Sequence, residues 1–92
     1  MTNKYLVEFL GTLLLSFVIF ATGNYLAIGA ALAAAVLLGG KISGGAFNPA
    51  VALAMFSAGK LPQKELLPYM AVEMLGAVAG LKLSKYIGNK GR

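Results

Sequence analysis

Cysteine and histidine are both absent from this sequence of 92 residues. Their absence excludes disulfide bonds, thiol chemistry, imidazole general bases and the usual zinc sites. Acidic side chains are scarce as well, because Asp and Glu together number only 3. We therefore expect no bound metal, no cofactor and no catalytic residue.

Charged side chains of both signs make up only 12% of the sequence, whereas hydrophobic side chains make up 59% and the mean hydropathy is +0.79. This composition is more apolar than that of an ordinary globular domain, and it predicts an integral, multi-pass membrane protein in contact with the lipid bilayer. The net charge of +5 comes from Lys and Arg side chains near the ends of apolar segments. They form no basic face interleaved with aromatic residues, so they indicate membrane flanks and no nucleic-acid partner.

Three apolar segments have the length of membrane-spanning helices, and they cover residues 5–21, 25–38 and 66–87. The first two are slightly shorter than the ~20 residues expected of a span, so we expect interfacial residues such as Tyr5 and Tyr25 to complete them. The first segment has the basic start of a signal peptide. Glu8 interrupts its apolar run and no soluble domain follows, which favours a permanent span.

A short helix is predicted between the second and third spans. Asn48 is a favoured N-cap, Pro49 is a favoured first helical residue, and the apolar run to Ala58 supplies the body of the helix. Such a helix would be about 15 Å long, half of the ~30 Å hydrocarbon core. We therefore expect residues 41–58 to form a re-entrant loop and half-helix. The alternative, an amphipathic helix on the membrane surface, is disfavoured because the run has no strongly polar face.

The glycine-rich stretch before this helix, residues 39–47, needs a physical reason to lie in the membrane. Non-helical backbone cannot face lipid, so it must be covered by protein or line a water-filled path. Gly44 and Gly45 allow the chain to turn there and to bring backbone carbonyls toward such a path. The start of the half-helix would repel cations and offer N–H donors to a neutral solute, and the Asn48 carboxamide adds another donor.

Small residues predict how the spans pack. Helices in lipid associate through close backbone approach, and Gly76 with Gly80 forms a pair of small residues four positions apart. A smooth face is also expected on the second span, formed by Ala27, Ala30, Ala31 and Ala34. Together these residues favour a tightly packed helical bundle.

Three motifs carry a resemblance to a known family: Glu8-Phe9-Leu10-Gly11-Thr12, Ile42-Ser43-Gly44-Gly45-Ala46-Phe47-Asn48-Pro49-Ala50-Val51, and Glu73-Met74-Leu75-Gly76-Ala77. In order and spacing they resemble the first repeat of the major intrinsic proteins, the aquaporin and glycerol-facilitator family, over nearly the whole chain. Members of that family join two such repeats in opposite orientations, and two Asn-Pro-Ala half-helices meet in a single-file pore. Residues 1–92 resemble one repeat, and we expect them to form a single all-α unit.

The resemblance implies a passive channel for water and small neutral solutes, and no enzyme, with the pore formed by an inverted homodimer. Asn48, Pro49 and Ala50 of both chains would meet at the centre of the pore, and Ile28 and Val51 would form apolar walls. Val51 stands where second repeats carry a filter arginine, and Ile28 stands where strict water channels carry a large aromatic residue. Selectivity between water, glycerol and urea is left open.

Two glutamates lie inside the predicted spans, where ionisable side chains are costly and are candidates for function. Glu8 and Thr12 share a helix face, and Glu73 is their counterpart in the third span. The resemblance implies that these residues accept hydrogen bonds that hold the Asn-Pro-Ala loop behind the pore. Two alternatives remain, a proton-coupled exporter that titrates Glu8, and a non-conducting partner or fragment of a full-length channel.

Overall fold

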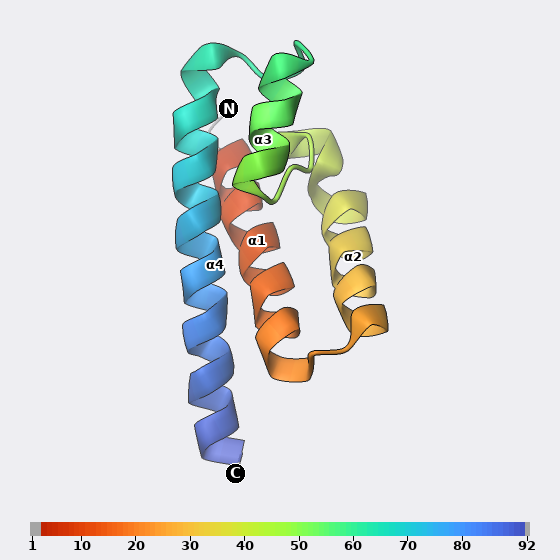
Figure 1. Cartoon of the computed structure of the whole chain (residues 1–92), viewed down its shortest axis with the longest axis vertical. Helices are drawn as coiled ribbons and strands as arrows, with labels where there is room; N and C mark the ends of the chain where they lie inside the picture. Colours follow the sequence, from red (N-terminus) through yellow and green to blue (C-terminus); the bar gives the residue numbers. More distant parts are fainter. Residues whose placement is uncertain (1–2, 92) are drawn as a thin grey trace.

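Four α-helices make up the part of the chain that the computed structural model describes, which is residues 3–91 with side chains through Gly88. They are α1 (Asn3–Thr22), α2 (Tyr25–Ser43), α3 (Pro49–Ser57) and α4 (Gln63–Gly91). The three long helices run lengthwise, and the short α3 packs near the end of the bundle where α1 and α4 begin (Figure 1). The predicted all-α class is confirmed.

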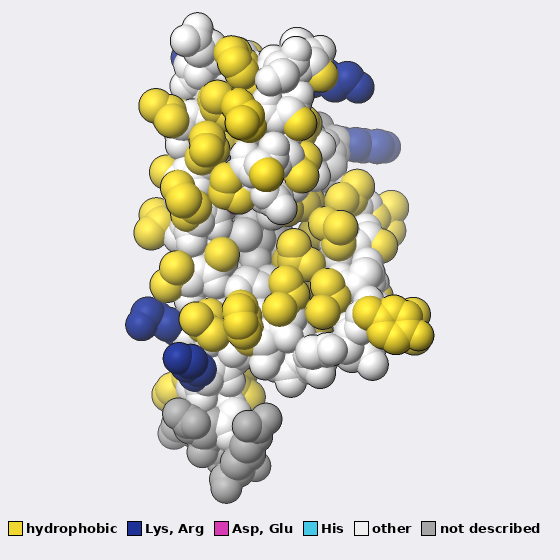
Figure 2. Space-filling view, in the orientation of Figure 1, with side chains coloured by type: hydrophobic (Ala, Val, Ile, Leu, Met, Phe, Trp, Pro, Cys, Tyr) yellow, Lys and Arg dark blue, Asp and Glu magenta, His cyan; other side chains and the backbone are white. Residues whose placement is uncertain are grey.

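The helices α1, α2 and α4 are each long and apolar enough to cross a membrane. Their outer faces support this, because large apolar side chains such as Leu26, Leu37 and Leu75 are exposed and apolar groups are spread over the visible surface (Figure 2). Such a surface is expected where lipid is the solvent. The prediction of three spans in an integral, multi-pass membrane protein is confirmed.

The end of α2 differs from the prediction. The helix continues to Ser43 instead of ending at residue 38, so residues 41–43 are helical and the non-helical connection is limited to residues 44–48. Gly39 packs against Val7 of α1, and the helix continues past it. Gly44 ends the helix because its φ is 92°, and its N–H donates to the Gly40 carbonyl over 2.8 Å. The last span likewise begins earlier than predicted, at Gln63.

Close packing of α1 on α4 depends on Gly76 and Gly80, the pair of small residues noted in the sequence. A Cβ atom at Gly76 or Gly80 would collide with the carbonyl oxygens of Phe9 and Leu13, respectively. The Ser16 hydroxyl donates a hydrogen bond to the Ala77 carbonyl over 2.6 Å and links the same two helices. This contact holds together α1 and α4, which carry most of the side chains that bind residues 43–48.

The helix α2 packs on α1 and, among the described elements, on no other helix. Its buried positions recur at every fourth residue, at Ala31, Ala35, Gly39 and Ser43. The predicted alanine face was therefore partly wrong, since Ala30 is exposed and Ala27 and Ala34 are half-buried. The face is set by the row of residues that meets α1, and alanine content alone does not reveal that row.

The buried apolar cluster lies where α3 meets α4, around Ala46, Ala52, Leu61 and Tyr69. Tyr5 of α1 meets Tyr69 edge-on, with ring centroids 5.6 Å apart and planes at 79°. An ion pair between Lys4 and Glu65 closes the same end of the bundle. The short helix α3 and the loop before it are thus packed against α4 and anchored beside α1.

Candidate functional site

The helix α3 starts as the sequence predicts. Asn48 is its N-cap, with extended backbone (φ −167°, ψ 127°), and Pro49 occupies the first turn. The Asn48 side-chain oxygen accepts a hydrogen bond from the Ala50 N–H over 2.7 Å, and the Asn48 carbonyl accepts from the Ala52 N–H over 2.9 Å. The carboxamide oxygen therefore serves the cap, which orients the amide nitrogen of an exposed side chain.

Glu8 of α1 binds the connection between α2 and α3. One carboxylate oxygen accepts hydrogen bonds from the Ser43 hydroxyl over 2.6 Å and from the Ala46 N–H over 3.2 Å, and the other accepts from the Phe47 N–H over 2.8 Å. The Glu8 side chain is fully buried. These hydrogen bonds satisfy loop N–H groups that could not be left unpaired in a membrane.

Two further side chains hold this loop, and the sequence analysis did not identify their roles. The Ser43 hydroxyl accepts from the Gly45 N–H over 3.2 Å, and the Tyr69 hydroxyl of α4 donates to the Ser43 carbonyl over 2.7 Å. Ser43 thereby connects α1, α4 and the loop. The available signals were a serine directly before two glycines and a tyrosine in the first turns of an apolar span.

Phe47 has an unusual backbone conformation, with a positive φ of 52° in a residue other than glycine. Gly44 and Gly45, where the turn was predicted, have φ values of 92° and 73°. The Phe47 side chain is 1% exposed, and its ring occupies the space that a Cβ atom of Gly11 would fill. Burial of the ring and the Glu8 bond to its N–H together hold a conformation that costs ~1–3 kcal/mol.

Thr12 and Glu73 lie beside the loop without hydrogen bonds to it. Both side chains are buried, and neither the Thr12 hydroxyl nor either Glu73 oxygen has a hydrogen-bond partner among the described residues. Of the three residues expected to support the loop, Glu8 makes the hydrogen bonds.

An open cavity of about 270 Å³ brings together Asn48 and Pro49 with residues from the middle of α1 and α4. Its remaining lining residues are Thr12, Leu15, Ser16, Ile19, Phe20, Phe47, Glu73, Met74 and Ala77. Ala50 and Val51 follow in the exposed first turn of α3. Ile28 lies in the second turn of α2, which does not pack against α3, so the described chain does not bring Ile28 to the Asn48 group.

The fold and the site thus define an integral membrane protein in which a short helix begins inside the bundle and a buried carboxylate holds the loop before it. The family model described as Major intrinsic protein matches residues 23–91. This chain belongs to the major intrinsic protein family.

Curated relatives support the same assignment. The chain is 40% identical over 85 residues to glycerol uptake facilitator protein-like 6 of Lactiplantibacillus plantarum, a match that covers 83% of this chain and 39% of the relative. It is 40% identical over 94 residues to aquaporin Z of Brucella melitensis, with 86% and 41% covered. The chain therefore spans about two fifths of the length of these relatives. No solved structure matches it significantly.

Proposed function

We propose that this chain forms half of a passive membrane channel for water and small neutral solutes such as glycerol, and that two copies in opposite orientations complete the pore. The observation that carries the proposal is the start of α3, where Asn48 caps a helix that begins beside the middle of α1. A helix start at that depth offers N–H donors and a partial positive charge, which suit a neutral hydrogen-bonding solute and disfavour cations.

The rigid attachment of this helix start also supports a channel. Glu8, Ser43 and Tyr69 fix the loop from three helices, so the Asn48 amide is preorganised without needing the solute. A fixed donor can exchange solutes quickly, since no loop has to order on each passage. In this proposal Asn48 orients the solute, Pro49 and Ala50 continue the helix start, and Val51 and Ile28 contribute to apolar walls.

The exposed apolar surfaces of the single chain support a second copy. Beside the cavity at Asn48, a groove of about 270 Å³ runs between α1 and α2, and its lining is entirely apolar side chains and glycines. The relatives are about two and a half times as long as the matched part of this chain, which leaves room in them for a second such unit. An inverted copy would supply that unit here.

The exporter alternative receives less support from the geometry. Both Glu8 oxygens accept hydrogen bonds, three in all, from groups in the loop and at the end of α2. Protonation of Glu8 would place an O–H group against donors that one of its oxygens now accepts from, and it would disturb the loop in each transport cycle. We therefore assign Glu8 a positioning role.

The test is stopped-flow shrinkage of liposomes that contain only the purified chain, with water, glycerol and urea as solutes. Asn48→Ala removes the cap and the amide at the cavity, and permeability is expected to fall severalfold at equal protein density. Asn24→Ala is the matched control, because Asn24 caps α2 by the same type of bond, to the Ala27 N–H over 2.9 Å. Each substitution removes a cap worth ~1 kcal/mol, and only the first should change flux.

Equal permeability in the two variants would contradict the role of Asn48. Absence of flux from the pure chain at the same protein density would exclude a self-sufficient pore and would favour a partner subunit or fragment. Flux that consumes a proton gradient would support the exporter.

A further inference from the structure

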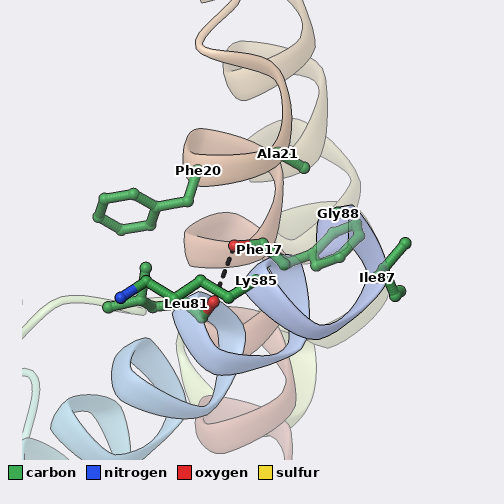
Figure 3. A pocket seen from close by; sticks show the side chains of 8 residues that line it. Phe17, Phe20, Ala21, Leu81, Lys85, Ile87 and Gly88 are labelled. Atoms are coloured by element: carbon green, nitrogen blue, oxygen red, sulfur yellow. Dashed lines mark hydrogen bonds between the residues drawn. The ribbon is translucent and has the colours of Figure 1, made fainter. Parts of the chain in front are cut away.

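Another depression lies at the opposite end of the bundle from the loop. It is a groove of about 330 Å³ between the last turns of α1 and those of α4. Its walls are largely apolar, and they consist of Phe17, Phe20, Ala21, Leu81, Ser84, Lys85, Ile87 and Gly88. Figure 3 shows the phenyl rings from α1 and the Lys85 side chain from α4 around this space. We call it the end groove.

The end groove carries uncompensated positive charge. Lys85 lines it, and Lys82 precedes Lys85 by three positions on the same helix, so both exposed ammonium groups lie on neighbouring turns of α4. Figure 2 shows dark blue side chains on this lower part of α4. Within the described chain the acids lie elsewhere, because Glu65 pairs with Lys4 at the other end and Glu8 and Glu73 are buried.

The Ser84 hydroxyl, next to Lys85 in the chain, already uses its proton and does not donate it to an anionic ligand. The Ser84 hydroxyl donates to the Leu81 carbonyl over 2.8 Å, and this bond is the dashed line in Figure 3. Recognition at the end groove therefore depends on the two lysines and on apolar contact. A ligand that fits this combination has an anionic group joined to a hydrocarbon chain.

The depth of the groove in the membrane selects the class of ligand. The groove lies at the end of two predicted spans, where α1 finishes at Thr22 and α4 continues past it (Figure 1). Exposed Tyr25 and Tyr86 lie near the same end, and tyrosine is enriched at the level of lipid headgroups. The lysines can thus extend to headgroup level while the phenyl rings remain at acyl-chain level.

We infer that the end groove is a binding site for an anionic phospholipid, whose phosphate pairs with Lys82 and Lys85 and whose acyl chain lies against Phe17, Phe20 and Leu81. Basic pockets between membrane helices commonly bind anionic headgroups. The inference does not depend on transport, because the groove is separate from the Asn48 helix start.

The experiment is native mass spectrometry of the detergent-purified chain titrated with phosphatidylglycerol or phosphatidylcholine of identical acyl chains. Phosphatidylglycerol is expected to bind more tightly. Lys82→Gln combined with Lys85→Gln should weaken its binding about 25-fold, from about fivefold for each lysine. Arg at both positions keeps the charge and should preserve the preference, which separates a charge effect from misfolding.

The matched control is Lys60→Gln combined with Lys64→Gln, which removes the same charge from exposed side chains at the other end of the bundle. This control should retain the preference for phosphatidylglycerol. Equal binding of both lipids, or equal weakening in the two double variants, would overturn the inference. Displacement of the lipid by millimolar glycerol phosphate, or by a second copy of the chain, would overturn it as well, because then the occupant would not be a phospholipid.

Discussion

Glu8 and Glu73 are both fully buried, but their surroundings differ. Glu8 accepts three hydrogen bonds from the loop and the end of α2, whereas neither Glu73 oxygen has a partner among the residues described. A buried carboxylate is tolerated when donors replace its lost hydration, and it is a liability when they do not. The same substitution should therefore lower stability at Glu8 and should not lower it at Glu73.

We predict that Glu8→Gln lowers the free energy of unfolding by about 2–4 kcal/mol, because glutamine keeps one acceptor oxygen and turns an amide NH₂ toward existing donors. Glu73→Gln should leave stability unchanged or raise it, because an ionisable group without a partner is replaced by a neutral one of the same shape. Thermal unfolding in detergent measures both. A larger loss in Glu73→Gln than in Glu8→Gln would refute the assignment.

The sequence predicted those site residues whose roles depend on their own neighbours in the chain. Asn48 and Pro49 specify a helix start, and Gly44 and Gly45 specify a turn, so local chemistry was sufficient. The roles of Ser43 and Tyr69 depend on groups 35 and 26 residues away, respectively. The conformation of Phe47 likewise depends on Gly11 of another helix, which no local pattern encodes.

At the level of helices, the contact between α1 and α4 depends on the absence of two side chains. Gly76 and Gly80 of α4 face backbone atoms of α1, whereas Gly29 of α2 has open space where its Cβ would lie. All three glycines are inside helices, so their intrinsic cost in helix propensity is similar. The same substitution, Gly→Ala, made at each of the three positions therefore separates the effect of packing from the effect of helix propensity.

We predict that Gly76→Ala and Gly80→Ala each destabilise the chain by about 1–3 kcal/mol, because one added methyl group forces α1 and α4 apart. Gly29→Ala should be neutral or stabilising by up to ~1 kcal/mol, since only the gain in helix propensity remains. Unfolding in increasing SDS provides the measurement. Equal effects at Gly29 and Gly76 would mean that the close approach does not contribute to stability.

Helix existence and type were predictable because long apolar runs leave few alternatives, but two features of α2 were not. Its end depends on which of four glycines is the first to adopt a positive φ, and that glycine is Gly44 rather than the earlier Gly39. Its packed face depends on the angle at which α2 meets α1. Both are properties of the assembled bundle.

For the whole molecule, the distribution of positive charge bears on orientation. The side that carries the start of α1 has Lys4, Lys41, Lys60 and Lys64, and the opposite side has Lys82, Lys85, Lys90 and Arg92, of which the Lys90 and Arg92 side chains lie outside the described residues. The cytoplasmic side of a membrane protein usually holds more Lys and Arg. An even distribution gives no strong preference.

We predict that the chain inserts in both orientations, as an inverted homodimer requires. Reporters at the C-terminus, one active only in the cytoplasm and one only outside, should both give signal. Two lysines added at either end should fix one orientation and abolish flux, and mixing the two fixed variants should restore it. Signal from only one reporter in the unmodified chain would exclude the homodimeric pore.

The loop before α3 is bound by one residue that precedes it in the sequence and by another that follows it. This order has a consequence for biosynthesis. Glu8 precedes the N–H group of Phe47 by 39 residues, whereas Tyr69 follows Ser43 by 26. As synthesis proceeds from the N-terminus, Glu8 is already in place when the loop emerges, and it can satisfy the loop N–H groups before α4 exists. The half-helix is therefore held first by the older part of the nascent chain, and Tyr69 completes the attachment once the last span has been made.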